Sequence, residues 1–345
     1  KRQPKVHIIV YNKGSYVFLI GKSRMAEYLK GERMRTSERI LQEVKKAVIG
    51  KDELLEKILM AILANGHILM EDMPGVGKTT IARAFADAMQ LDCRRMQFTV
   101  DVLPADVTGF SVIDPQTGKT QIRKGAVFTN LFLADEINRT SSRTQAALLE
   151  VMEEGSVSVD GITMTLEQPF LVIATQNPYG SAGTQQLPES QLDRFMIRLE
   201  IGYPQEHDEI EILKRKQNPQ SYRVQCVAQR TQILEMQKAC REVFVHDSLY
   251  HYIIQLLQAT RNNQRIYRGA SPRAGVALLD MSKACALLQG RDYVVPEDIQ
   301  NVFVDTIAHR ILMQPSHSID AAAAKDALTQ LLHHIQPPHT RRKGL

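Results

Sequence analysis

The sequence predicts an α/β protein, in which strands and helices alternate up to about residue 204 and helices alone follow. One observation is the apolar run 68–70, which leads through a glycine-containing loop into a segment with apolar residues at helical spacing. A second is a pair of later apolar runs, 131–134 and 170–175, which have the length of buried strands. The third is that apolar residues beyond residue 204 recur only at helical spacing, in segments 210–213, 233–236, 252–257 and 276–287.

The composition indicates a soluble globular protein, and the charge distribution bears on nucleic-acid binding. With 43% hydrophobic and 23% charged residues, the chain of 345 residues is typical of a soluble globular protein with a sizeable core. The net charge of +5 comes from the ends: residues 1–35 carry nine Lys or Arg against two acids and residues 341–343 add three more, which leaves 36–340 at −5. A basic total therefore gives no argument for nucleic-acid binding. Four widely spaced cysteines without a C-x-x-C pair indicate reduced thiols in a cytosolic protein.

The N-terminal extension, residues 1–32, receives no function from its sequence. Two apolar runs, 6–10 and 16–20, flank an Asn-Lys-Gly-Ser turn and predict a hairpin. Neither run is long enough to span a membrane. A helix is expected from about residue 33, and a second helix after Gly50 leads directly into the strand before the glycine loop.

The stretch 71–80, E-D-M-P-G-V-G-K-T-T, has the strand, glycine loop and helix context of a phosphate-binding loop. Its glycines let the backbone wrap a triphosphate, and the amides that open the helix point at phosphate oxygens. Lys78 would reach the β- and γ-phosphates, and Thr79 would ligand Mg²⁺. The full pattern G-x-x-x-x-G-K-[ST] requires glycine where this chain has Asp72, while the core from Gly75 onward is intact. The alternative is a glycine turn between a core strand and a core helix.

Two acids, Asp135 and Glu136, end the apolar run 131–134. A buried strand that stops at paired carboxylates supplies an aspartate that holds Mg²⁺ through water and a glutamate that orients and polarises the attacking water. The alternative is a strand that ends in solvated acids. Their place some fifty-five residues after the phosphate loop favours the catalytic interpretation.

Three further polar residues are candidates for the same chemistry. Asn177 follows the strand 170–175, and an amide at the carboxyl end of a strand could hold the nucleophilic water, although Asn before Pro is also ordinary loop chemistry. Arg194 precedes a predicted strand, 196–201, and Arg273 lies in the first turn of a helix opened by Ser-Pro. Both arginines could equally form surface ion pairs.

Two hairpins are predicted between these motifs. The region 101–128 is punctuated by Gly, Pro and Asp, with a hairpin turned at 114–118. The stretch 156–165 shows period-two alternation on either side of an Asp-Gly turn, which predicts a second hairpin. A strand near 96–100 and a helix over 144–154 are expected beside them.

Together these motifs resemble those of the AAA+ ATPases, and within that superfamily those of the MoxR family. The phosphate loop resembles the Walker A motif of the superfamily, and Asp135-Glu136 resembles its Walker B motif. Further along the chain, Asn177 corresponds to sensor 1, Arg194 to the arginine finger and Arg273 to sensor 2. MoxR proteins in particular are similar in the stretches A-D-E-I-N-R, A-T-Q-N-P and L-P-E-S-Q-L-D-R-F, which begin at Ala134, Ala174 and Leu187. The resemblance covers about residues 36–313.

The resemblance implies a three-layer α/β core with a parallel sheet, followed by an all-helical lid. The expected domains are the N-terminal extension, the AAA+ core over 33–204, the lid over 205–313, and a C-terminal tail over 314–345 that contains a short helix. In this family the hairpins near 101–128 and 156–166 face a central pore or the client protein.

The resemblance also implies roles for individual residues. Catalytic roles are expected for Glu136, Asn177, Arg194 and Arg273, and Thr79 and Asp135 are the expected metal ligands. The expected nucleotide-binding residues are Val48, Ile49, Pro74, Gly75, Val76, Gly77, Lys78, Thr79, Thr80 and Asp135.

By resemblance, the protein is expected to be an Mg²⁺-dependent ATPase with ATP and Mg²⁺ as cofactors. It would assemble into a homo-oligomeric ring, expected to be a hexamer, in the cytoplasm. It would remodel or mature protein clients, among them partners with von Willebrand factor A-type domains.

Two other functions remain open at this point. A nucleic-acid translocase or the motor subunit of a metal chelatase would share all five motifs. The acidic body and the lack of a basic stripe interleaved with aromatics argue against nucleic acid, although pore-loop lysines such as Lys119 and Lys124 could suffice. A nucleotide-sensing scaffold with little turnover would need none of Glu136, Asn177 and Arg194, so their presence argues against that function.

Overall fold

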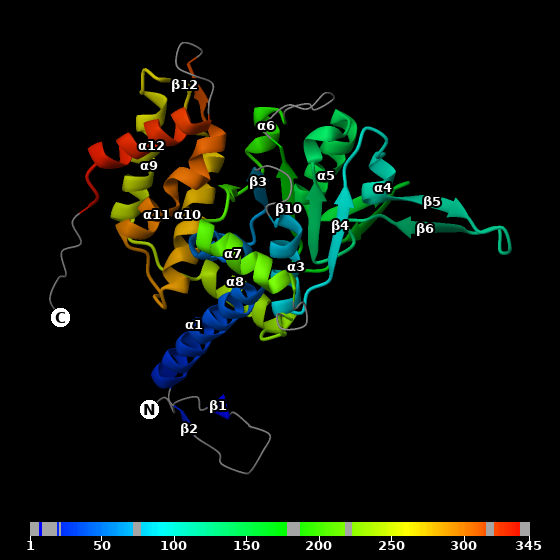
Figure 1. Ribbon diagram of the computed structural model, residues 1–345, viewed down its shortest axis with the longest axis horizontal. Helices are drawn as coiled ribbons and strands as arrows, with labels where there is room; N and C mark the ends of the chain where they lie inside the picture. Colours follow the sequence, from blue (N-terminus) through cyan, green and yellow to red (C-terminus); the bar gives the residue numbers. More distant parts are fainter. Residues whose placement is uncertain are drawn as a thin grey trace, which may run out of the picture.

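The computed structural model describes residues 7–8, 19–20, 22–71, 77–177, 187–217, 223–314 and 321–338. An α/β core and a helical lid lie side by side in Figure 1, where the lid helices run from yellow-green (α7 and α8) to red (α12). At the start of the chain, β1 (His7–Ile8) and β2 (Leu19–Ile20) pair antiparallel, as the predicted hairpin requires. The rest of that predicted hairpin lies outside the described residues.

A five-stranded sheet forms the centre of the core, with strand order β11-β3-β10-β7-β4. Every neighbouring pair in this sheet is parallel, which confirms the expected parallel sheet. Parallel strands share one carboxyl edge, so the residues that follow β3, β7 and β10 are brought together there. The strands are β3 (Ile68–Glu71), β4 (Cys93–Gln97), β7 (Leu131–Asp135), β10 (Leu171–Gln176) and β11 (Ile197–Glu200).

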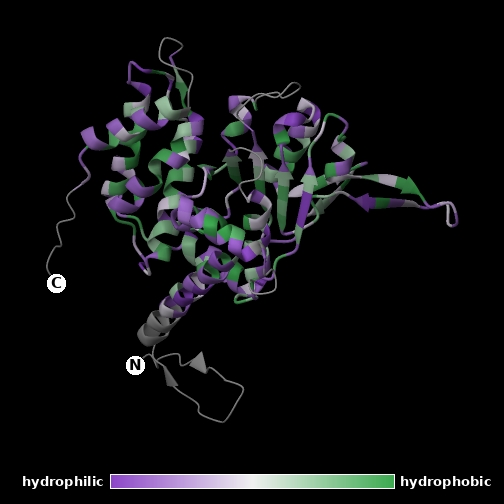
Figure 2. Ribbon diagram, viewed as in Figure 1, coloured by the Kyte–Doolittle hydropathy of each residue, from purple (hydrophilic) through white to green (hydrophobic). Residues whose placement is uncertain are grey.

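The edge strand β4 corrects the prediction of a strand at 96–100. It begins at Cys93, opposite Leu131 of β7, and ends at Gln97. Its residues, C-R-R-M-Q, are all exposed or half-buried, and the strand is largely purple in Figure 2. An edge strand of this kind has no apolar run, so its bounds are set by backbone hydrogen bonding to β7 and not by a hydrophobic signal.

Helices cover both faces of the sheet and make the expected three layers. Consecutive side chains of β3 point to opposite faces, so Ile68 and Met70 belong to one apolar cluster and Leu69 to the other. The first cluster includes residues of the lid, which packs directly onto the core. The helices of the first face are α1 (Lys22–Ala47), α2 (Asp52–Leu63) and α3 (Lys78–Ala88), and those of the second are α4 (Pro104–Thr108) and α5 (Ser142–Glu154).

Both predicted hairpins of the core are present. The first consists of β5 (Gly109–Ile113) and β6 (Thr120–Lys124), and Figure 1 shows it projecting away from the lid. The second consists of β8 (Ser156–Val159) and β9 (Ile162–Thr165). Short helical turns, η1 (Ile137–Arg139) and α6 (Glu189–Leu192), follow the sheet strands β7 and β10 along the chain.

The lid is helical, with one addition that the sequence did not indicate. The strands β12 (Ile266–Arg268) and β13 (Leu312–Met313) pair antiparallel, which corrects the expectation of helices alone after residue 204. Segments of two or three residues are too short to show a period-two pattern. The lid elements are α7 (Glu206–Lys216), α8 (Arg230–Arg241), α9 (Asp247–Arg261), α10 (Pro272–Leu288), α11 (Pro296–Ile307) and η3 (Ala308–Arg310).

The last helix, α12 (Ala321–His334), packs against the lid. Leu328 is fully buried, and Ala324 and Ala327 join Ile266 and Met313 in a small apolar cluster. The tail helix that the sequence predicted is therefore present, with 14 residues, and it is packed onto the lid. None of the helices in the described part of the chain combines the length and the apolar character needed to cross a bilayer.

Candidate nucleotide-binding and hydrolysis site

The carboxyl edge of the sheet brings together the residues that follow β3, β7 and β10. The register places Gln176 opposite Glu71 and Ala174 opposite Ala134, so Thr175 lies beside Asp135. The phosphate loop, the paired acids and Asn177 are thus neighbours, as the order of the motifs predicts.

The described part of the phosphate loop is the start of α3. Gly77 has φ 96°, a backbone conformation that glycine adopts at little cost, and it forms the N-cap of the helix. Lys78, Thr79 and Thr80 make the first turn, which contains no acid. The backbone amides that open a helix attract anions. Pro74, Gly75 and Val76, which were also predicted to bind the nucleotide, lie outside the described residues.

Asp135 is held by donors from both neighbouring strands. Its Oδ1 accepts a 2.6 Å hydrogen bond from the Thr175 hydroxyl on β10. Its Oδ2 accepts bonds from Nη2 (2.6 Å) and Nε (3.0 Å) of Arg95 on β4. Sequence reasoning gave neither partner a role. Arg95 belongs to no motif, Thr175 lies in the A-T-Q-N-P stretch without an assigned role, and the approach of both to Asp135 depends on the order of the strands.

Glu136 adopts a left-handed backbone conformation, with φ 56° and ψ 49°. A residue other than glycine pays about 1 kcal/mol for this conformation. Here the Glu136 N–H donates to the Thr175 hydroxyl at 2.9 Å, so one hydroxyl binds both neighbouring acids. The Glu136 carboxylate forms an ion pair with Nη1 of Arg139 at 2.9 Å.

Asn177 follows β10 directly, where the sequence predicted it. Its carbonyl oxygen accepts a 3.2 Å bond from the side-chain amide of Asn138, two residues beyond Glu136. Behind it, Gln176 donates to the buried Glu71 carboxylate, which also pairs with Arg198 at 3.5 Å. These contacts connect the ends of β3, β10 and β11 at the carboxyl edge of the sheet.

The predicted metal ligands fit Mg²⁺ by the chemistry of their donors. Thr79 offers a hydroxyl oxygen and Asp135 a carboxylate, and Mg²⁺ prefers oxygen ligands. Throughout the described ranges, no group of three or more His, Cys, Asp or Glu side chains is arranged to hold a metal ion. The ion would therefore depend on phosphate oxygens and water for its remaining ligands, as is usual for Mg²⁺.

Val48 and Ile49 lie at the junction between the core and the first lid helix. Both are half-buried between α1 and α2. Next to them, Gly50 has φ 69° and is so close to the Asp208 carboxylate of α7 that a β-carbon there would collide with it. Lys51 Nζ donates to the Tyr203 carbonyl at 2.9 Å. This segment is therefore bound to the start of the lid.

Arg194 and Arg273 meet at the opposite, amino edge of the sheet. Arg194 Nη1 lies 2.7 Å from Oε2 of Glu153, and Arg273 Nη2 lies 2.5 Å from its Oε1. Arg194 Nη1 also donates to the Leu149 carbonyl at 2.8 Å. Glu153 lies in the last turn of α5 and was not identified from the sequence.

The position of this cluster at the amino edge is fixed by His67, the residue before β3. His67 Nε2 lies 3.0 Å from the Met152 carbonyl, and the His67 carbonyl accepts a 2.8 Å bond from the Met196 N–H. The four residues of β3 span about 13 Å at about 3.3 Å per residue, so this edge is at least that far from the phosphate loop. The structure thus groups Arg273 with Arg194 at this edge, and Lys78, Asp135, Glu136 and Asn177 at the other.

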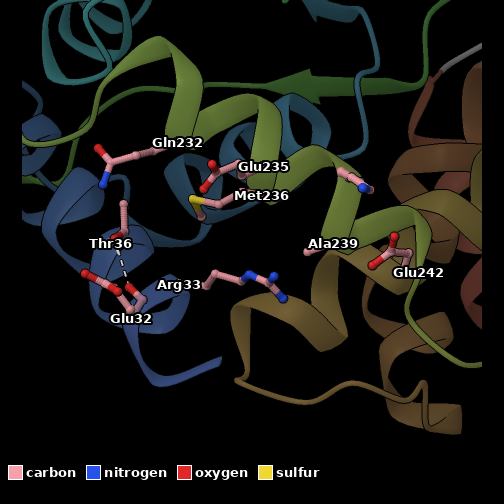
Figure 3. Close-up of a pocket in the computed structure, with 9 residues that line it drawn as sticks. Glu32, Arg33, Thr36, Gln232, Glu235, Met236, Ala239 and Glu242 are labelled. Atoms are coloured by element: carbon pink, nitrogen blue, oxygen red, sulfur yellow. Dashed lines mark hydrogen bonds between the residues drawn. The ribbon is translucent and has the colours of Figure 1, made fainter. Parts of the chain in front are cut away.

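Two cavities lie outside the carboxyl edge. One, of about 350 Å³, is lined by residues of the amino edge that include His67, Glu153 and Arg194. The other, of about 410 Å³, lies between α1 and α8. Figure 3 shows its lining, with Glu32 and Arg33 on α1 and Met236 and Glu242 beside them from the segment of α8. It contains none of the predicted nucleotide-binding residues.

Comparison with known proteins agrees with this arrangement. Residues 67–197 match the ATPase family associated with various cellular activities (AAA), and residues 258–330 match the AAA lid domain. Chaperone MoxR1 of Mycobacterium tuberculosis is 36% identical over 91% of this chain and 85% of its own length. The chain belongs to the MoxR family of AAA+ ATPases.

Two further proteins are similar over most of the chain. The uncharacterized protein YeaC of Bacillus subtilis is 41% identical over 87% of this chain and 94% of its own length. The crystal structure of a putative ATPase from Cytophaga hutchinsonii superimposes with a TM-score of 0.86 at 35% identity, covering 92% of this chain and 99% of that one. The MoxR core and lid are thus those of an AAA+ ATPase, as predicted.

Proposed function

We propose that this protein is an Mg²⁺-dependent ATPase that hydrolyses ATP between the subunits of a homohexameric ring and uses the reaction to remodel protein partners. The observation that supports it best is the division of the predicted machinery between the two edges of the sheet. Lys78, Asp135 and Glu136 lie at the carboxyl edge, whereas Arg194 and Arg273 lie at the amino edge. One subunit therefore presents the predicted phosphate-binding and water-activating residues at one edge and the two predicted trans arginines, Arg194 and Arg273, at the other.

The residues at the carboxyl edge each have a role in hydrolysis. Lys78 gives the β- and γ-phosphates a positive partner, and Thr79 and Asp135 would hold Mg²⁺, which when bound neutralises charge on the phosphate oxygens. Glu136 orients the attacking water and accepts its proton, and Asn177 holds that water against the γ-phosphate. Thr175 positions the two acids relative to each other through its two hydrogen bonds.

The arginines at the amino edge act on the nucleotide of the neighbouring subunit. Arg194 is about one third exposed and lines the cavity at that edge, so a partner can reach it. A guanidinium placed against the γ-phosphate stabilises the negative charge that develops in the transition state, an effect worth roughly 10³- to 10⁵-fold in rate. In the free subunit, Glu153 neutralises both arginines until a neighbour supplies the competing phosphate.

Remodelling of a protein is the proposed use of the reaction. The relative from M. tuberculosis is named a chaperone, and the family resemblance suggests partners with von Willebrand factor A-type domains. The projecting β5–β6 hairpin exposes Phe110 (44%) and Ile113 (71%), apolar side chains that a protein client can cover. A cytoplasmic location is part of the proposal.

Mixing two inactive variants tests the division of the site. Lys78→Ala keeps the arginine finger, Arg194, but has a defective nucleotide pocket. Arg194→Ala keeps the nucleotide pocket but lacks the arginine finger. Each variant alone should therefore be inactive. In a ring assembled at random from equal amounts, about one quarter of the interfaces pair an intact pocket with an intact finger, and activity should return in that proportion. The measurement is the rate of phosphate release at several mixing ratios, and native mass spectrometry verifies that the two variants assemble into mixed rings.

The matched control is a mixture of Lys78→Ala with Glu136→Gln. Both variants have a defective pocket and an intact finger, so no interface is complete and the mixture should stay inactive. If the Lys78→Ala and Arg194→Ala subunits assemble into mixed rings that remain inactive, the proposed shared site is wrong.

A further inference from the structure

Arg310 is a buried cation that joins the lid to the loop of Arg194. It ends η3, and its side chain is only 2% exposed. Its three nitrogens donate five hydrogen bonds, four of them to residues 193–196 of the core. The acceptors are Asp193 Oδ1 (2.8 Å), Asp193 O (3.2 Å), Phe195 O (2.7 Å), Met196 O (3.1 Å) and Thr306 O (2.6 Å).

Two other lid residues hold the same loop. His309 Nε2 lies 2.9 Å from the Phe195 carbonyl, and the Ser271 hydroxyl donates to Oδ2 of Asp193 at 3.1 Å. Ser271 is the N-cap of α10, two residues before Arg273. The Asp193 carboxylate is therefore bound through one oxygen to the end of the lid and through the other to the helix that carries Arg273.

Burying a guanidinium costs desolvation free energy, so holding the lid against the core does not by itself explain why an arginine occupies this position. Apolar side chains of similar volume often hold two surfaces together as well as a buried ion pair does. Burial lowers the Arg310 pKa to about 10, and the group still stays charged at neutral pH. What a planar guanidinium provides that an apolar side chain does not is a fixed set of donor directions, and here three of the five bonds go to backbone carbonyls of the loop.

We propose that Arg310 is a positioning residue that makes the Arg194 loop move with the lid. Through Asp193 and the carbonyls of residues 193–196 it holds Arg194 at a fixed position relative to Arg273 and the rest of the lid. A displacement of the lid therefore moves both arginines relative to the neighbouring subunit's phosphate. This inference rests on the proposed function, because it assigns Arg310 to the trans arginines and not to the pocket of its own subunit.

Arg310→Lys is the informative variant, because lysine keeps the charge but cannot reproduce five directed bonds. A misplacement of about 1 Å at a reacting centre costs up to about 100-fold in rate, so kcat should fall about 10- to 100-fold while ATP affinity stays unchanged. Arg265→Lys is the matched control. Arg265 is also a lid arginine paired with an aspartate, Asp326, but it is 30% exposed and its side-chain bonds go to α12 and not to the loop, so kcat of this variant should not change.

Mixed rings distinguish positioning from a general structural defect. Mixed with Lys78→Ala, the Arg310→Lys subunits keep an intact pocket and should regain activity; mixed with Arg194→Ala, both subunits have a defective finger and activity should stay low. A general defect would damage the pocket of the Arg310→Lys subunit, so the first mixture would remain inactive, which overturns the inference. If Arg310→Lys does not fold, Asp193→Asn removes the charge of the same link and should behave in the same way.

Failure of this inference and failure of the shared site give different patterns. Recovery with Lys78→Ala and Arg194→Ala, but none with Lys78→Ala and Arg310→Lys, leaves the shared site intact and refutes the role of Arg310. No recovery in either mixture refutes both.

Discussion

Acid should destabilise this protein through His67. The Val172 N–H donates to Nδ1 of the imidazole at 3.0 Å, so Nε2 carries the proton and donates to the Met152 carbonyl at 3.0 Å. Both ring nitrogens are thus satisfied in the neutral form, and burial lowers the His67 pKa from 6.5 to about 4. Protonation would give Nδ1 a second N–H that faces another N–H donor.

The sign and the size of the effect follow from this lowered pKa. Below pH 6.5 the unfolded chain binds a proton that the folded protein excludes until about pH 4, so stability is complete above 6.5 and falls as the pH decreases through that window. At pH 5, 1.5 pH units below the unfolded pKa, the loss is about 2 kcal/mol at about 1.4 kcal/mol per unit. The complete difference, at about pH 4, is about 3 kcal/mol.

The assay is urea unfolding of wild type and His67→Gln at pH 7.5 and pH 5. Glutamine offers an amide donor and a carbonyl acceptor but does not titrate, so it removes the pH dependence of this position and retains that of all other groups. Between pH 7.5 and pH 5 the wild type should lose about 2 kcal/mol more unfolding free energy than His67→Gln does. An equal pH dependence in both proteins would refute the reasoning, because another group would then be responsible.

Three further substitutions address the nucleotide site. Glu136→Gln should bind ATP normally and hydrolyse it orders of magnitude more slowly, since only the water-activating carboxylate is lost; robust phosphate release would place the catalytic base elsewhere. Thr175→Val keeps the shape but removes the hydroxyl that the Glu136 N–H and the Asp135 Oδ1 atom bind, so it should cost about 1 to 3 kcal/mol in unfolding free energy and lower kcat; unchanged values of both would show that the hydroxyl is dispensable. Arg273→Ala should lower kcat without changing ATP affinity and should regain activity with Lys78→Ala, whereas weaker ATP binding would indicate a role at its own pocket.

The carboxyl edge of the sheet could be predicted closely because its signals are local. A strand, a glycine turn and a helix with Lys78 in its first turn follow one another within a few residues, and the acids follow a buried strand directly. Parallel pairing then needs no further information to bring the ends of such strands to one edge. Strands without an apolar run were the exceptions, as the polar edge strand β4 shows.

The partners of these residues could not be predicted, because they come from distant parts of the chain. Arg95 reaches Asp135 across forty positions, and Arg310 reaches Asp193 across 117. No periodicity or spacing encodes such contacts, since strand order and lid packing decide them.

By itself, the sequence determined the fold class, and it identified the glycine loop, the paired acids, Arg194 and Arg273 as candidates. Only the tertiary structure decided that these two arginines share Glu153 at the edge opposite the phosphate loop and that Arg310 connects them to the lid. The physical reason is that a motif is formed by neighbours in the chain, whereas the position of one motif relative to another depends on which faces the core and the lid bury against each other.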